Sequence, residues 1–371
     1  MCGALLGGLA LISLVIAAPS MGVPMWSRRY GVACTACHFY PSLQLNANGL
    51  DFLRRGHRFA GDSSDKDLSH LISAHAEWSD AVQQGQSTAF TSPEFHLHAG
   101  GALSSLFSAY VDANVNSDFE SSYLQFTTPG DSTYFTARVG KISPTLIRNW
   151  GNGLLASAST PLIITDATLD TNPFTLARGS YGVDVGGRID GFFLQGGVVN
   201  GDDVAGQAAV NNHKDVFATA EVNLPDSVSG VALYYYRGSY DMGDPAAGPL
   251  SLDRYDRRGV FANFTSDRMR LAGAYLYGRD RVATLSGRTI RGYYVQADAR
   301  PSEWAAPFLR YDDTKADAAT GVQRVRQETA GCALQVFQTE TTAGRLVVEL
   351  ARRSEAGVNT NSAFLDLLWA L

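Results

Sequence analysis

Two cysteines and a histidine near the start of the chain have the spacing of a covalent haem site. The run Cys34-Thr-Ala-Cys37-His38 places two thiols three positions apart, and a histidine directly follows the second thiol. Two thiols at this spacing can add to the two vinyl groups of a haem, and the adjacent histidine can then bind the iron from one face. The motif predicts one covalent c-type haem on Cys34 and Cys37, with His38 as the proximal iron ligand.

Two other uses of a Cys-x-x-C pair fit the sequence less well. A thioredoxin-like redox pair gives no role to His38, and a structural zinc site needs ligands that no second cysteine pair supplies. Residues 3–18 form an apolar, uncharged run of the type found in secretion signals. Export of the chain also favours haem, because c-type haem is attached outside the cytoplasm. We expect residues 1–20 to be a signal peptide. A retained membrane anchor is the alternative, although the run is short for a spanning helix.

The residues after the motif predict one short helix and a second iron ligand. Apolar residues between Leu45 and Leu53 fall at helical spacing, asparagines near the start can cap the helix, and Gly56 can end it. His57 follows at the point where the chain must fold back over the haem. We therefore expect His57 to be the distal ligand of a cytochrome segment that covers residues 21–68.

Several alternatives to this ligand remain open. Other side chains that can close the sixth position are Met25, His70 and His75. His57 can also be simply exposed beside the basic cluster Arg54, Arg55 and Arg58.

Most of the remaining chain alternates between apolar and polar residues. In residues 107–115, Phe107 and Val111 share one face, whereas Tyr110 and Asp112 share the other. Residues 293–299 and 345–353 follow the same period of two, which indicates β-strands of about ten residues. One apolar and one charged face, repeated over residues 69–371, predict a mainly β chain: a transmembrane outer-membrane barrel of about 16 antiparallel strands with a polar lumen.

The expected links between strands support a barrel, because outer-membrane barrels alternate short turns with longer loops. Short links are expected near residues 103–105, 130–131, 190–191, 225–226, 267, 301–302 and 341–342, and longer ones around 80–92, 142–177, 200–213, 240–255, 279–288 and 314–326. The chain also ends on alternating large apolar residues, Leu365, Leu367, Trp369 and Leu371, as a terminal barrel strand does.

Composition narrows the possible partners. The formal net charge is −6 and the pI is about 5.6, which argues against nucleic acid. No Gly-rich phosphate loop, G-x-S-x-G turn or H-E-x-x-H motif occurs, so hydrolytic chemistry has no support. His96 and His98 share a strand face and can bind a metal ion near the pore, although polar lining of the lumen explains them equally simply. The lumen acids Asp112, Asp184, Asp298 and Glu349 can dock the basic cluster of the haem segment.

The haem motif and the residues after it resemble the outer-membrane cytochrome–porin fusions, a family with iron-oxidising members. The resemblance rests on residues 34–38 and on Pro41, Leu45-Asn46, Gly49, Phe52 and Gly56. It covers about 30 residues, and the rest is agreement of architecture. Two features depart from the family pattern. The barrel is shorter than in the acidophilic members, and His57 stands where an aromatic residue is expected.

The resemblance implies an outer-membrane electron conduit. Such a protein passes electrons between an extracellular donor, with Fe(II) the most specific expectation, and a periplasmic c-type cytochrome. Its chemistry would be that of an Fe(II):cytochrome c oxidoreductase, with the barrel surrounded by outer-membrane lipid. Two alternatives remain: a diffusion porin with a haem-containing plug or sensor segment, and a soluble periplasmic cytochrome.

Overall fold

The computed structural model describes residues 25–39, 42, 44–63, 67, 70–85, 92–115, 119–143, 155–165, 174–176, 179–201, 213–225, 228–242, 251–282, 288–318, 321–339 and 343–370. The expected signal peptide over residues 1–20 and the terminal Leu371 lie outside these residues. None of the described helices is long and apolar enough to cross a membrane.

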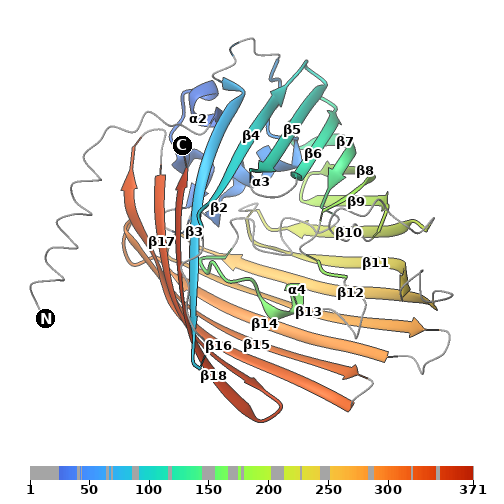
Figure 1. The fold of residues 1–371 in the computed structure, drawn as a ribbon. Helices are drawn as coiled ribbons and strands as arrows, with labels where there is room; N and C mark the ends of the chain where they lie inside the picture. Colours follow the sequence, from blue (N-terminus) through green and yellow to red (C-terminus); the bar gives the residue numbers. More distant parts are fainter. Residues whose placement is uncertain are drawn as a thin grey trace, which may run out of the picture.

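Sixteen antiparallel strands close into one barrel (Figure 1). They are β3 (Ile72–Gln83), β4 (Glu94–Ala102), β5 (Phe107–Asn114), β6 (Phe119–Thr127), β7 (Thr133–Ile142), β8 (Ser180–Ile189), β9 (Phe192–Val199), β10 (Asp215–Asn223), β11 (Gly230–Met242), β12 (Ser251–Thr265), β13 (Met269–Val282), β14 (Arg288–Ala299), β15 (Ala305–Ala318), β16 (Gly321–Gln338), β17 (Ala343–Glu355) and β18 (Val358–Ala370). Each strand pairs with its sequence neighbour, and the pairing of β18 with β3 closes the ring. The predicted 16-strand barrel is confirmed.

The two faces of each strand divide as the alternation predicts. On β14, Tyr294, Gln296 and Asp298 are at most 3% exposed and face the lumen, whereas Tyr293 and Val295 are 39% and 46% exposed on the outer face. The outer surface is therefore apolar, and the polar side chains are directed inward. This is the arrangement of a barrel surrounded by lipid.

The seven short links lie where they are expected. The long link predicted over residues 240–255 is shorter, because β11 runs to Met242 and β12 starts at Ser251. The long link predicted over residues 314–326 is wrong. Strand β15 runs to Ala318 and β16 starts at Gly321, and these two residues pair with each other. The charged residues in and beside this stretch led to the prediction of a loop. In the structure, Arg324 on β16 forms an ion pair with Asp313 on β15. Cross-strand pairs of opposite charge stabilise a sheet, which explains why paired strands replace the expected loop.

The N-terminal residues form a compact unit, here called the plug (residues 25–63). It contains α2 (Met25–Tyr30), the 3-10 turn η1 (Cys34–Ala36), the short pair β1 (His38–Phe39) and β2 (Gln44–Leu45), and α3 (Ala47–Arg54). Helix α3 is the helix predicted from the sequence. The Asn46 side chain accepts a hydrogen bond from the Gly49 backbone N–H and caps its start, and Gly56 adopts φ +76° just after its end.

The plug lies inside the end of the barrel that carries the short links. Arg55 donates hydrogen bonds to the carbonyl oxygens of Gly130 and Asp131 in the β6–β7 turn. Arg58 donates to the carbonyl oxygen of Ser104 in the β4–β5 turn. Because short turns mark the periplasmic end of outer-membrane barrels, the plug occupies that end of the lumen.

The predicted docking of the plug on lumen acids is only partly right. Asp298 accepts a hydrogen bond from Gln44 Nε2 at 2.6 Å. Arg54 forms a buried ion pair with Glu221, a residue that the sequence analysis did not single out. The other acids expected to dock the plug instead contact the barrel wall or the lumen loop described next; they are Asp112, Asp184 and Glu349.

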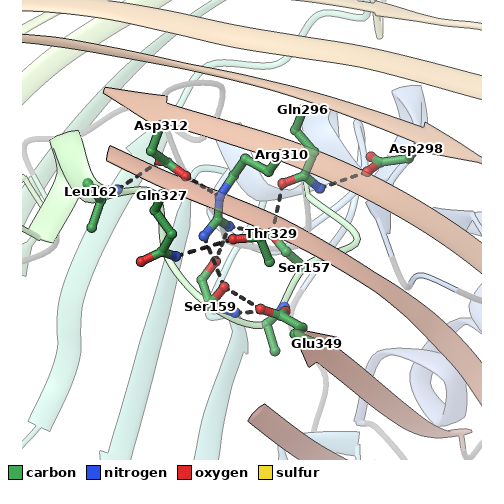
Figure 2. A network of polar contacts seen from close by, with 11 residues as sticks. Ser157, Ser159, Leu162, Gln296, Asp298, Arg310, Asp312, Gln327, Thr329 and Glu349 are labelled. Atoms are coloured by element: carbon green, nitrogen blue, oxygen red, sulfur yellow. Dashed lines mark hydrogen bonds and ion pairs between the residues drawn. The ribbon is translucent and has the colours of Figure 1, made fainter. Parts of the chain in front are cut away.

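Part of the long β7–β8 connection folds into the lumen, and we call it the inner segment (residues 155–165). It includes α4 (Leu162–Thr165) and lies inside the ring of strands (Figure 1). Glu349 on β17 accepts hydrogen bonds from the backbone N–H groups of Ala158 at 2.5 Å and Ser159 at 3.1 Å. Arg310 on β15 donates to Ser157 Oγ at 3.0 Å (Figure 2). Charged side chains of the barrel wall thus provide hydrogen-bond partners for the polar groups of this irregular segment.

Replacement of Glu349 by Gln should loosen the inner segment while the barrel stays closed. The amide keeps only one acceptor oxygen and loses the negative charge, at a cost of about 1.5–3 kcal/mol. We expect the Ala158 and Ser159 amides to exchange with solvent deuterium roughly tenfold faster or more. Hydrogen exchange read by mass spectrometry measures this. Glu303→Gln, in the exposed β14–β15 turn, should change nothing, and equal exchange in Glu349→Gln and the wild type would contradict the assigned anchor.

Candidate functional site

The Cys-x-x-C-His loop is held by the start of α3. Residues 34–36 form the single 3-10 turn η1, in which the Cys37 backbone N–H donates to the Cys34 carbonyl at 3.1 Å. Asn46 Nδ2 and Asn48 Nδ2 both donate to the Ala36 carbonyl, at 3.1 and 3.2 Å. The asparagines predicted as helix caps therefore also fix the loop that carries both thiols.

Gly49 allows α3 to lie directly against this loop. A Cβ at position 49 would come within 2.3 Å of the Cys37 carbonyl oxygen and 2.8 Å of Leu45 Cδ2. His38 follows at once and pairs with Leu45 in the β1–β2 ladder. The close helix approach and the two-residue ladder together set the positions of Cys37 and His38.

One cavity of about 620 Å³ brings the predicted site residues together. Cys34, Cys37, His38 and His57 all line it. Its other walls come from α2 and α3, from strands β3, β4, β5, β17 and β18, and from residues 157–161 of the inner segment. The volume falls within the roughly 300–1,000 Å³ range of cofactor sites. Two thiols at haem-attachment spacing and two imidazoles around one cavity fit the haem that the motif predicts.

His57 contacts three aromatic residues. Its ring stacks on Tyr110 with centroids 3.9 Å apart and on Trp26 at 5.4 Å with an interplanar angle of 8°. Tyr123 Oη lies 3.1 Å from His57 Nδ1. The backbone at His57 has φ +62°, a left-handed conformation that is unfavourable for a residue with a Cβ. Packing that holds a histidine in this conformation is a feature of functional positions.

Burial shifts the pKa values of Cys37 and His57 in opposite directions. Burial and the neighbouring Cys34 raise the pKa of Cys37 to about 11. Burial, followed by the nearby His98 and Arg138, lowers the pKa of His57 to about 3. His57 is therefore a neutral imidazole at physiological pH, and the neutral imidazole is the form that binds a metal.

The alternatives to His57 divide into two groups. Met25 and His75 line the same cavity, so the structure keeps them as possible distal ligands. His70 is not among the residues that line it, and its side chain lies 3.7 Å from Asp67. The alternative of an exposed His57 is wrong, because the residue is 8% exposed. Its role as an iron ligand stays a prediction.

His96 and His98 belong to a hydrogen-bonded group on the barrel wall. His98 Nε2 lies 2.7 Å from His75 Nδ1, and His98 Nδ1 lies 2.8 Å from Tyr110 Oη. His96 Nδ1 lies 3.2 Å from Asp112 Oδ1. Within the described residues, no group of three or more His, Cys, Asp or Glu side chains could hold a metal ion. The arrangement favours polar lining of the lumen over the metal site considered from the sequence.

Sequence reasoning missed the contribution of the barrel wall to this site. Tyr110 was placed on the lumen face, but its contact with His57 depends on how deeply the plug enters the barrel. Tyr123 and the inner segment were not singled out. Tyr110 on β5 and Tyr123 on β6 lie opposite each other in the strand pair. The only sequence signal for them is that both fall on the lumen-facing positions of their strands.

Comparisons with solved structures match the barrel to outer-membrane proteins and channels, including a porin. OmpT of Vibrio cholerae is 10% identical, with 84% of this chain and 100% of that chain covered and a TM-score of 0.58. An anion-selective porin from Comamonas acidovorans is 13% identical, with 81% and 99% covered and a TM-score of 0.57. The channel DcaP of Acinetobacter baumannii is 9% identical, with 84% and 100% covered and a TM-score of 0.54. No protein-family model and no curated protein matches the chain.

The chain is a porin-like outer-membrane barrel. The fold follows from the structural likeness, and the location follows from an outer surface on which Leu194, Leu233 and Leu350 expose 57%, 57% and 63% of their area. This surface does not fit the soluble periplasmic cytochrome. Identities near 10% establish the fold alone, and they give no support for a fused cytochrome. The comparisons thus support the porin-like barrel, which the diffusion-porin alternative shares, and leave the electron-transfer role without support.

Replacement of Gly49 by Ala should expose the Cys37 thiol. The new Cβ must displace either α3 or the Cys37 carbonyl, and the wild-type thiol is shielded by burial and a high pKa. In protein expressed without haem, we expect iodoacetamide to label Cys37 roughly tenfold faster than in the wild type. Peptide mass spectrometry measures the rate. Gly196→Ala, on β9, is the matched control, because its Cβ meets nothing closer than 3.3 Å. Unchanged labelling would show that α3 does not press on the loop.

Proposed function

We propose that this chain is an outer-membrane electron conduit that carries one covalent haem on Cys34 and Cys37 inside its barrel. His38 would bind the iron as the proximal ligand and His57 as the distal ligand. The observation that supports this most strongly is the common cavity in the lumen, which is lined by both thiols and both histidines. A haem held there supplies one-electron transfer.

The position of the plug supports this function physically. Hydrocarbon is a barrier to electron transfer beyond short distances, so the cofactor has to be carried into the plane of the membrane. The plug enters the lumen from the end with the short turns and is fixed there by the Arg54–Glu221 ion pair and by the Arg55 and Arg58 contacts to the turns. Two imidazoles on the iron would favour electron transfer over ligand binding.

The proposed net reaction moves one electron between two partners. Extracellular Fe(II) is oxidised to Fe(III), and one molecule of an oxidised periplasmic c-type cytochrome is reduced. The chain would thus act as an Fe(II):cytochrome c oxidoreductase, and another extracellular redox donor would follow the same electron balance. Iron is the donor that the resemblance implies, and no residue of the chain is assigned here as an iron-substrate ligand.

A diffusion porin with a haem-containing plug is the second candidate, because the solved structures that resemble the barrel include an anion-selective porin. The inner segment and the plug both occupy the lumen, and they pack against wall residues such as Tyr294, Asp298 and Glu349. This filling favours the conduit. The two candidates differ in whether the intact protein conducts ions.

Replacement of Cys37 by Ala should remove most covalent haem. One of the two thioether bonds can no longer form, and we expect haem staining on a denaturing gel to fall to a small fraction of the wild-type signal per barrel. Cys332→Ala is the matched control, because this third described cysteine lies outside the motif, and it should stain fully. Equal staining of Cys37→Ala and wild type would refute the haem assignment.

Intact cells that carry the chain should reduce a periplasmic cytochrome when Fe(II) is added outside. Cells with His38→Ala, matched for barrel level by heat-modifiable gel mobility, should not. In planar bilayers the wild-type protein should stay closed, and a variant without residues 25–67 should open. Porin-level conductance of the wild type, with cytochrome reduction equal in both strains, would replace the conduit with the porin.

A further inference from the structure

Tyr123 is a barrel residue that contacts the candidate distal ligand. It lies on β6, and its hydroxyl is 3.1 Å from His57 Nδ1. Behind it, the Arg138 guanidinium lies 5.4 Å from the centre of the Tyr123 ring. Arg138 is itself held by Asp184, with N–O distances of 3.1, 3.1 and 2.6 Å. The tyrosine is therefore fixed from the wall side as well as from the plug side.

We infer that Tyr123 is the positioning residue that selects which nitrogen of His57 faces the iron. The inference rests on the haem proposed above. A hydrogen bond at Nδ1 leaves Nε2 as the nitrogen available to a metal, and the partner of the second nitrogen commonly fixes the tautomer of a ligating histidine. Trp26 and Tyr110 both stack on the ring and restrict its plane. Tyr123 adds what stacking cannot, namely the rotation of the ring within that plane.

The direction of this hydrogen bond follows from the ligation. An imidazole that binds iron through Nε2 carries its proton on Nδ1, so His57 donates and the Tyr123 oxygen accepts. Donation to an acceptor makes the ligating nitrogen more basic, which stabilises the ferric state. Loss of the acceptor should therefore raise the midpoint potential and weaken the iron–His57 bond.

Tyr236 on β11 gives a control, because it is a buried lumen tyrosine that is not among the residues lining the cavity. Its hydroxyl donates to Asp215 Oδ2 at 2.6 Å. Tyr236→Phe removes one bonded tyrosine hydroxyl from the lumen without touching His57. A change that occurs in Tyr123→Phe and is missing in Tyr236→Phe thus reports the bond to His57 and not a general loosening of the lumen.

The test uses the full-length, haem-loaded protein in detergent, with Tyr123→Phe, Tyr236→Phe and His57→Ala compared with the wild type. We expect Tyr123→Phe to keep its haem stain, to shift its midpoint potential upward, and to bind external cyanide roughly tenfold more tightly, because the hydrogen-bond partner of a metal-binding histidine contributes on the order of 10–100-fold. Tyr236→Phe should match the wild type in both measurements. His57→Ala should lose the low-spin spectrum.

The possible failures are distinguishable. If His57→Ala loses the low-spin spectrum but Tyr123→Phe keeps the wild-type potential and cyanide affinity, the role of Tyr123 is wrong and the haem proposal stands. An unchanged spectrum in His57→Ala moves the distal ligand to Met25 or His75 and also overturns the inference. A wild-type protein without covalent haem ends the proposed function itself.

Discussion

Backbone hydrogen bonding in a lipid environment is the constraint on which the rest of this structure depends. Hydrocarbon offers no partner to an exposed N–H or C=O group, so a spanning sheet must close on itself. Here the pairing of β18 with β3 completes the ring of 16 strands. Closure divides every strand into a lipid face and a lumen face, and polar side chains can then lie only inside or beyond the membrane. The polar lumen therefore follows from closure.

Charged side chains buried in the lumen need ion-pair or hydrogen-bond partners inside the barrel. The plug and the inner segment supply such partners. Arg54 in the plug pairs with Glu221, and Glu349 accepts hydrogen bonds from the inner segment. The two parts also meet through one strand of the wall. On β14, Asp298 bonds to Gln44 of the plug and to Gln296, which in turn accepts from Ser157 of the inner segment. Each insertion thereby contributes to holding the other.

The same barrel scaffold can serve unrelated purposes, because function depends on the residues presented in the lumen. The solved structures that resemble this chain are outer-membrane proteins and channels. What gives this lumen its own chemistry is the meeting of the Cys-x-x-C-His loop with a histidine that stacks on Trp26 and Tyr110. The strained backbone at His57 persists because the wall and the plug fix that residue together.

The sequence by itself determined the features that depend on local order. Two-residue alternation revealed strand number and facing, since side chains on a strand alternate strictly, and the spacing of Cys34, Cys37 and His38 suggested a haem motif. Asn46 and Gly56 marked the limits of α3. The extended β15–β16 hairpin was missed, because the pairing of Asp313 with Arg324 is cross-strand and not local.

Tertiary structure alone decided where these parts meet. The depth of the plug in the lumen, the Glu221 partner of Arg54 and the contact between Tyr123 and His57 all join residues more than 60 positions apart. The folding of the inner segment onto Glu349 spans an even longer separation. Such contacts are set by the closed shape of the barrel and by the need to pair buried charge, and neither is visible in the period or spacing of the residues.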